Sequence, residues 1–183
     1  MKDPVLVDAL IVKGKAAEAK ARKLFEGITA EQFNRQPAPG SWSAAKCLEH
    51  LVISDSLYFK QLDEVSLAIY RMSRWARISP FSRIFGRTLI RSLRESNAKP
   101  MKTHWKLVPT PPPLDVGFVE IYLKNLNRFL AYIAACKYAD LDEIILTSPV
   151  AGFVTYSLRD CLSFLVEHEH RHLNQAARAL SHH

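Results

Sequence analysis

Apolar residues recur every three or four positions along four stretches of the chain, and this spacing predicts four amphipathic helices. The first helix is expected to begin at Asp3-Pro4, where a capping aspartate precedes proline, and to end near Glu26. The second is expected to run from Ser43 to about Tyr70. Residues 29–40 contain two prolines and a glycine, which indicates a connecting loop. The expected apolar face of the second helix consists of Cys47, Leu51, Ser54, Tyr58, Leu62, Val65 and Ile69.

Two further helices are expected in the second half of the chain. One follows Asp115, which can cap it, and the other runs from Ser157, which forms a capping-box pattern with Asp160, to about Leu180. The β-branched residues of 147–156 indicate a loop or a short extended segment. The expected apolar faces are Val119, Tyr122, Leu126, Phe129 and Ile133 in the third helix, and Leu158, Cys161, Leu165, His168, His172 and Ala176 in the fourth. Four such helices predict an all-α fold, a four-helix bundle in a single domain.

The regular pattern is interrupted between the second and third helices, over residues 71–113. Pro80, Gly86 and Pro100 break this segment, so that only one or two short basic amphipathic helices are expected in it. Between Arg71 and Lys106 there are ten basic residues and one acidic residue, whereas the net charge of the whole chain is +7. The sequence therefore describes a nearly neutral domain that carries a basic insertion.

The basic insertion has two interpretations. It either packs its apolar side on the bundle as a solvated flap, or it presents a surface to an anionic partner such as a substrate carboxylate or phosphate, a nucleic acid or acidic lipid headgroups. The sequence has no zinc-finger, helix-turn-helix or RNA-binding signature, so we expect no specific nucleic-acid recognition. The residues expected to form the anionic-partner patch are Arg83, Arg87, Arg91 and Arg94.

Composition narrows the class of protein. Of the 183 residues, 48% are hydrophobic and 23% are charged, which excludes a disordered or collagen-like chain. Since no run of 18 apolar residues is present, no membrane-spanning helix is expected, and the N-terminal pattern is not that of a signal peptide. The three cysteines, Cys47, Cys136 and Cys161, form no CxxC pair, which favours a reducing, cytoplasmic location.

Histidines supply the candidate chemistry. His168 and His172 are four residues apart on the apolar face of the last helix, so both are expected to point into the core. Each imidazole has two ring nitrogens to satisfy away from water, and a metal ion satisfies one of them. His50, at the edge of the apolar face of the second helix, is the third candidate. Three neutral imidazoles can bind a divalent ion, zinc or nickel, and leave an open position for a water or a thiolate.

Two motifs that contain these histidines resemble those of a known family. The stretch Phe33-Asn34-Arg35-Gln36-Pro37-Ala38-Pro39-Gly40-Ser41-Trp42-Ser43, followed by Cys47-Leu48-Glu49-His50-Leu51, resembles the opening of the second helix in the DinB-like superfamily. The ending Glu167-His168-Glu169-His170-Arg171-His172-Leu173-Asn174-Gln175 resembles its terminal helix. The resemblance covers most of the chain apart from the basic insertion. It implies a DinB-like bundle with an up-down-down-up course and a divalent metal on His50, His168 and His172.

The resemblance also bears on activity. Characterised members include thiol-S-transferases that use low-molecular-weight thiols such as bacillithiol, thiol-dependent isomerases and domains fused to ergothioneine-synthesising enzymes, and many members are dimers. It therefore implies a metal-dependent enzyme that activates a thiol or a water, and a homodimer. The sequence lacks the glutamate of an HExxH motif, which favours thiol transfer over hydrolysis. The alternative is a non-enzymatic binding protein with a structural or vestigial metal site, whose basic insertion docks on an anionic membrane surface or an acidic protein.

Other residues near the motifs are weaker candidates. Gln175, three residues after His172, is expected either to orient a metal ligand or a bound water or to be an ordinary packing amide. Asp160 is a candidate acceptor for an imidazole N–H group. Glu49 is expected to be a surface carboxylate, since a helix turns it about 100° away from His50. Cys47 is expected to be a buried structural thiol.

Overall fold

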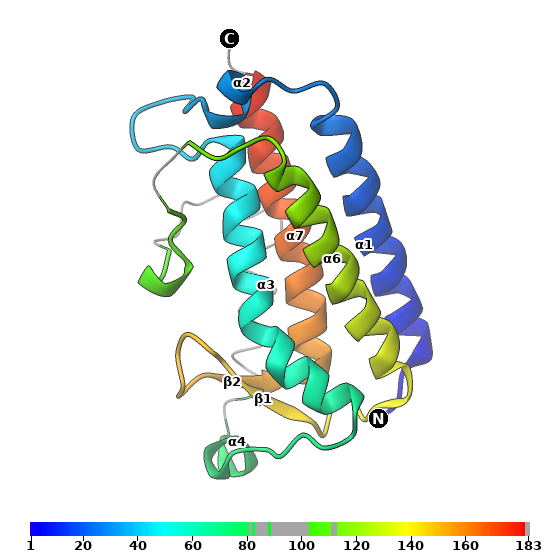
Figure 1. The fold of residues 1–183 in the computed structure, drawn as a ribbon. Helices are drawn as coiled ribbons and strands as arrows, with labels where there is room; N and C mark the ends of the chain where they lie inside the picture. The colour runs from blue at the N-terminus through cyan, green and yellow to red at the C-terminus, as the bar shows by residue number, and fades with distance from the viewer. Residues whose placement is uncertain (81, 83–87, 89–102, 111–112, 182–183) are drawn as a thin grey trace.

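The structure, a computed structural model, describes residues 1–80, 82, 88, 103–110 and 113–181. Its body consists of four long helices: α1 (Pro4–Leu24), α3 (Ala44–Ser66), α6 (Phe118–Ala135) and α7 (Leu158–Ser181). These helices lie side by side and run up, down, down and up in chain order (Figure 1). The predicted all-α fold, a four-helix bundle, is confirmed.

A continuous hydrophobic core joins the helices because each turns its apolar face inward. The helix α3 packs against both α6 and α7, and α1 packs against the same two helices. Leu126 and Phe129 of α6 are fully buried in this core. The helices α1 and α6 meet closely at Gly14, where a Cβ atom would lie 2.2 Å from Cδ2 of Leu130. The missing side chain of Gly14 leaves the space that Leu130 fills.

Side-chain oxygens cap three of the four long helices at residues that the sequence indicates. Asp3, Ser43 and Ser157 each accept a hydrogen bond from the backbone N–H three residues later, at 3.0, 3.2 and 3.1 Å. Each bond satisfies one of the amides that the first turn of a helix leaves without a backbone partner. These caps fix where α1, α3 and α7 begin.

A short helix, α2 (Ala30–Asn34), occupies part of the segment that the sequence indicates as a loop, so that expectation is wrong for these residues. Thr29 and Gln32 form a capping box at its start. The fully buried Phe33 packs edge-on against Phe25 at 5.8 Å between ring centroids. The burial of one aromatic side chain stabilises a helix that would be too short to form alone.

Two helix ends differ from the prediction. The helix α3 ends at Ser66 rather than near Tyr70, so Ile69 is exposed instead of facing the core. The helix α6 begins at Phe118, because the carboxylate of Asp115 accepts a hydrogen bond from the backbone two residues later and forms a turn before the helix starts.

The segment before α7 forms a β-hairpin, which settles the choice left open by the sequence between a loop and an extended piece. Strands β1 (Ile145–Thr147) and β2 (Thr155–Ser157) pair antiparallel, with Leu146 opposite Tyr156. The hairpin lies at one end of the bundle, and the short helix α4 (Arg74–Ile78) packs against it (Figure 1). Two 3₁₀ turns complete the described elements, η1 (Trp105–Leu107) and η2 (Cys136–Tyr138).

Most of the basic insertion lies outside the described residues, and so do the four arginines of the expected patch, Arg83, Arg87, Arg91 and Arg94. Among the residues that the structure does describe, no helix is both long enough and apolar enough to cross a bilayer.

Candidate metal centre

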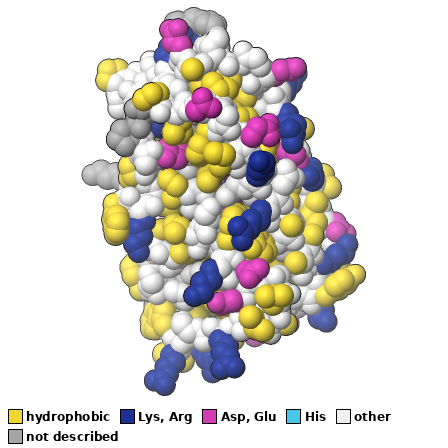
Figure 2. Space-filling model, viewed as in Figure 1, with side chains coloured by type: hydrophobic (Ala, Val, Ile, Leu, Met, Phe, Trp, Pro, Cys, Tyr) yellow, Lys and Arg dark blue, Asp and Glu magenta, His cyan; other side chains and the backbone are white. Residues whose placement is uncertain are grey.

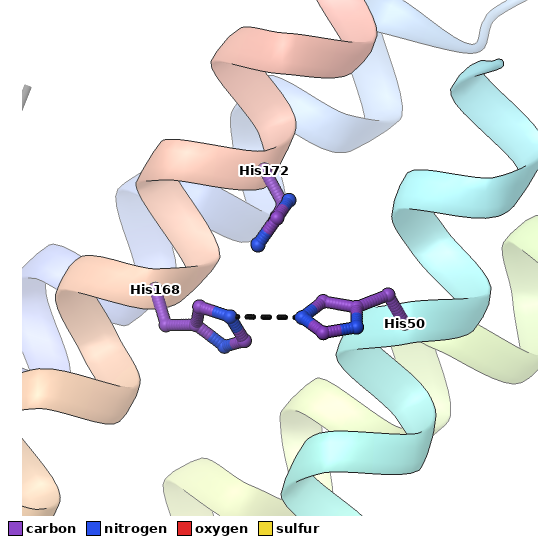
Figure 3. Close-up of side chains that lie close together, drawn as sticks. All are labelled: His50, His168 and His172. Carbon is purple, nitrogen blue, oxygen red and sulfur yellow. Dashed lines mark hydrogen bonds between the residues drawn. The ribbon is translucent and has the colours of Figure 1, made fainter. Parts of the chain in front are cut away.

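The three predicted histidines meet between two antiparallel helices. His50 projects from α3, and His168 and His172 project from successive turns of α7 (Figure 3). Each of the three can direct one ring nitrogen so that these atoms all lie within 4.8 Å of one another. The three residues are buried, with exposed fractions of 4%, 9% and 8%. The fold therefore brings His50 next to two histidines that follow it by 118 and 122 positions in the sequence. Those two histidines are four positions apart on one helix.

The spacing of the ring nitrogens fits a divalent ion. The Nε2 atoms of His50 and His168 are 3.1 Å apart (Figure 3). Because zinc–imidazole bonds are about 2.0–2.1 Å long, two ligand nitrogens on one ion are separated by roughly 3.0–3.4 Å. Imidazole is also a ligand type that zinc, nickel and copper prefer. The arrangement can hold one divalent ion with three protein ligands and at least one further coordination position.

Hydrogen bonds orient all three imidazoles toward the centre. The Nδ1 of His50 donates to the backbone oxygen of Leu107 at 2.8 Å, and the Nδ1 of His172 donates to Oε1 of Gln175 at 3.0 Å. The Nδ1 of His168 makes a longer hydrogen bond to Oγ of Ser54, at 3.5 Å. A neutral imidazole that donates from Nδ1 has its lone pair on Nε2, which is then the ligand atom. Gln175 is therefore hydrogen-bonded to one of the three histidines of the cluster.

Electrostatics keep the histidines neutral without a metal. Burial lowers the pKa of all three, and the charges of neighbouring imidazoles lower the pKa of His168 and His172 further. The pKa of His172 falls to about 3. At neutral pH the imidazoles are therefore unprotonated, and a metal ion does not have to displace protons to bind them.

Trp42 forms one wall of the histidine cluster. Its ring stacks on that of His172 at 5.6 Å between centroids, with 26° between the planes, and lies 4.9 Å from the ring of His50. The N-cap Ser43 fixes the start of α3 and thus the position of the neighbouring Trp42. In the motif Trp-Ser, the tryptophan packs against the histidines and the serine caps the helix that carries His50. The sequence indicated the importance of this motif only through the family resemblance.

A strap, residues 104–110, packs against α3 beside the cluster. Its Leu107 accepts the hydrogen bond from His50, and its Thr110 donates to Glu49 through the backbone N–H at 3.0 Å and through Oγ1 at 2.5 Å. Glu49 is only 8% exposed, so the expectation of a surface carboxylate is wrong. Two adjacent residues of α3, Glu49 and His50, thus hold the strap against this helix by hydrogen bonds.

Two buried carboxyl groups follow histidines of the cluster closely in the sequence. They do not belong to the cluster but form a pair of their own. Asp55 of α3 is 1% exposed, and Glu169 of α7, which follows His168, is fully buried. Oε2 of Glu169 accepts from the hydroxyl of Tyr122 at 2.5 Å, whereas its Oε1 and both carboxylate oxygens of Asp55 have no donor from other groups. Burial and their mutual repulsion raise the pKa of Asp55 well above its usual value, and burial raises that of Glu169 to about 7. One proton shared between the two carboxyls would link one oxygen of Asp55 to Oε1 of Glu169 and leave the second oxygen of Asp55 without a donor among the described residues.

Two other candidates do not join the cluster. Asp160 lies in the first turn of α7, eight residues before His168, which corresponds to about 12 Å along the helix. Cys47 is fully buried, and burial raises the pKa of its thiol to about 12, so it remains a protonated structural thiol.

A large cavity opens beside the histidines. Its volume is about 1460 Å³, and the loop before α3, the helices α3 and α7, the hairpin and the strap all contribute to its lining. The three histidines and Trp42 belong to this lining. The open coordination position of a bound ion would therefore face a space large enough for an organic substrate.

A family comparison agrees with this geometry. The sequence profile of the DinB superfamily matches residues 14–176, which include both motifs and all three histidines. The chain belongs to the DinB superfamily. Searches of curated proteins and of solved structures find no match. Superfamily membership together with the buried histidine cluster is compatible with a metal-binding DinB protein, and neither observation specifies the metal.

We expect the change His168→Ala to abolish stoichiometric metal binding, because it removes one of three ligands. Elemental analysis of protein purified without added metal, and after incubation with zinc or nickel, measures this directly. His170→Ala is the matched control, since His170 is on the same helix but bonds to the backbone oxygen of Lys13. In the parent and the control, metal should also raise the melting temperature, since an ion that binds only the native state stabilises it. Equal metal content in both variants would contradict the assignment.

We expect the change Asp55→Asn to flatten the pH dependence of stability. The pKa of Asp55 is higher in the folded than in the unfolded state. The contribution of Asp55 to the free energy of unfolding is therefore fully present below about pH 4, and it is lost as the pH rises toward the folded pKa. Between about pH 5 and pH 8, the free energy of unfolding should therefore fall less steeply in the variant than in the parent.

Urea denaturation in the presence of a chelator measures this difference without interference from bound metal. Asp63→Asn is the matched control, because Asp63 is an exposed aspartate on the same helix. Parallel stability curves for Asp55→Asn and the parent would show that the buried carboxyls do not share a proton.

Proposed function

We propose that this protein is a metal-dependent thiol-S-transferase. In this proposal His50, His168 and His172 hold a divalent ion, zinc or nickel, and a low-molecular-weight thiol binds at the open position. The observation that carries the proposal is the meeting of three buried, neutral imidazoles at the wall of a cavity of about 1460 Å³. A site meant only to stabilise the fold would be closed by a fourth protein ligand.

The chemistry follows from the ion and from the neutrality of its ligands. A bound divalent ion supplies a Lewis acid that lets a thiol lose its proton to solvent near neutral pH. The three histidines would hold the ion at the cavity wall, and the ring of Trp42, which contacts His50 and His172, would shield one side of the site from water. The chemistry that the ion would supply there is attack of a thiolate on an electrophilic carbon, in which the leaving group departs with the electron pair of the bond that breaks.

The surroundings favour a thiol over a water as the nucleophile. A metal-bound water in a hydrolase works with a general base, usually a carboxylate within hydrogen-bond reach. Among the described residues, the cluster that can hold the ion contains histidines only. Asp55 and Glu169 are paired with each other in the core and do not line the cavity. A thiol deprotonated on binding needs no such base.

We expect metal-loaded protein to accelerate conjugation of a thiol to an electrophile such as monochlorobimane. Bacillithiol, glutathione and cysteine should be compared, with fluorescence of the conjugate as the measurement. The change His172→Ala should lower the rate at least about 100-fold, because an active-site metal supplies several kcal/mol of stabilisation. His170→Ala should leave it unchanged. Rates that survive both His172→Ala and chelation would contradict the proposal.

A second candidate function rests on the end of the bundle near α4. The exposed side chains of Arg71, Arg74 and Arg77 alternate there with the exposed side chains of Trp75 and Ile78. Figure 2 shows Lys and Arg side chains together at the lower end of the molecule, where Figure 1 places α4. A surface that mixes arginine with exposed aromatic and aliphatic groups suits an anionic lipid surface. We propose peripheral membrane contact through this end.

We expect the protein to sediment with vesicles of phosphatidylglycerol and not with vesicles of phosphatidylcholine alone. Added salt should weaken the binding, since it screens exposed charges. Replacing Arg71, Arg74 and Arg77 by Glu should abolish it.

The matched control for that experiment replaces three exposed lysines elsewhere, Lys23, Lys60 and Lys124, by Glu. It changes the net charge equally, so a specific surface should tolerate it much better. Equal losses of binding in the two triple variants would reject this surface and leave net charge as the cause.

A further inference from the structure

The cavity beside the histidines is divided into two regions of different chemistry. The part of its lining that comes from the second half of α7 contains Arg171, Asn174, Gln175 and Arg178, and the strap contributes His104. This part is polar and basic. The part that comes from the hairpin and from the facing turns of α3 and α7 is mainly apolar, with Ser54 and Ser148 as polar members, and its larger side chains are Leu57, Tyr58, Val150, Val154, Tyr156 and Phe164. The histidines lie between the two regions, because α3 and α7 run antiparallel past each other (Figures 1 and 3).

Aromatic rings close the apolar region at its far end. The ring of Phe164 lies edge-on to Tyr58 at 5.8 Å and to Tyr156 at 5.2 Å between centroids. The hydroxyls of Tyr58 and Tyr156 are hydrogen-bonded to each other. Burial raises the pKa of both tyrosines, so neither ionises near neutral pH. The described lining of this region therefore contributes no charged side chain.

The depth of the apolar region can be measured along α3. Tyr58 follows His50 by eight residues, which corresponds to about 12 Å at 1.5 Å per residue. Ser54, midway between them, uses its hydroxyl proton in hydrogen bonds to the backbone oxygens of His50 and Leu51, so it leaves no donor for a ligand. An extended chain of about ten carbon atoms spans this distance.

We infer that the apolar region is the subsite for the second substrate, a molecule with an uncharged alkyl or aryl group of up to about ten carbon atoms. This inference rests on the proposed function, because the thiol then occupies the basic region and the electrophilic carbon lies next to the histidines. The arginines of the basic region suit the carboxylates of a low-molecular-weight thiol. Both substrates thus reach the centre from opposite directions.

The subsite can be tested on metal-free protein with N-phenyl-1-naphthylamine, an uncharged probe that fluoresces in apolar surroundings. We expect saturable binding of one probe per chain. Val154→Trp places a large side chain in the apolar region and should weaken binding at least about tenfold. Phe153→Trp is the matched control, since Phe153 is on the same hairpin but is 67% exposed. Ala151→Trp, also in the cavity lining, replaces Val154→Trp if circular dichroism shows that the latter does not fold.

Metal-loaded protein tests whether the subsite continues from the metal centre. Alkyl hydroxamates combine a metal-binding head with a chain of chosen length and should displace the probe. From acetohydroxamate to octanohydroxamate we expect the affinity to rise up to about fourfold for each added methylene, and then to level off. Val154→Trp should remove this dependence on chain length, whereas Phe153→Trp should keep it.

The outcomes separate this inference from the function it builds on. Probe binding that Val154→Trp abolishes, in a protein that takes up no metal, would support the subsite and reject the metal-dependent transferase. Stoichiometric metal with no probe binding, or with hydroxamate affinities that do not depend on chain length, would reject the subsite and leave the transferase standing. Equal probe binding in Val154→Trp and the parent would also reject it.

Discussion

The burial of three imidazoles side by side is the constraint on which the rest of the site depends. Each ring has two nitrogens, and the three residues are at most 9% exposed, so most of these nitrogens depend on partners other than bulk water. The protein supplies partners on the outer sides of the three rings, from Leu107, Ser54 and Gln175. The inner nitrogens face one another, and only one proton can lie between two of them. A divalent ion is a partner that could satisfy all three at once.

The sequence predicted the parts of this arrangement that depend on helical periodicity. The four long helices, the caps at Asp3, Ser43 and Ser157 and the inward direction of the histidines all follow from residues spaced a few positions apart. Local patterns also gave the starts of the helices better than their ends. The helix α3 ends where Ala68 adopts a positive φ of 56° and the N–H groups of Ile69 and Tyr70 bond back to the carbonyl of Glu64. Alanine is not a residue that signals such a turn in a sequence.

Features that depend on tertiary contacts could not be predicted in this way. Glu49 has the helical position of a surface residue, but the strap covers it and supplies two hydrogen bonds. Asp55 and Glu169 belong to different helices, and only the packing of α3 against α7 makes them a pair that shares a proton. The short helix α2 owes its stability to the burial of Phe33. In each case the missing information was which distant segment lies next to the residue.

The strap has a consequence for how the centre is coupled to the rest of the chain. The carbonyl of Leu107 holds the proton of His50 on Nδ1, and the bonds from Thr110 to Glu49 keep that carbonyl in place. The docked strap therefore favours the ligand-ready tautomer of His50. By the reciprocity of linked equilibria, an ion that favoured this tautomer would also favour the docked strap, and lifting the strap would weaken binding of the ion by the same factor.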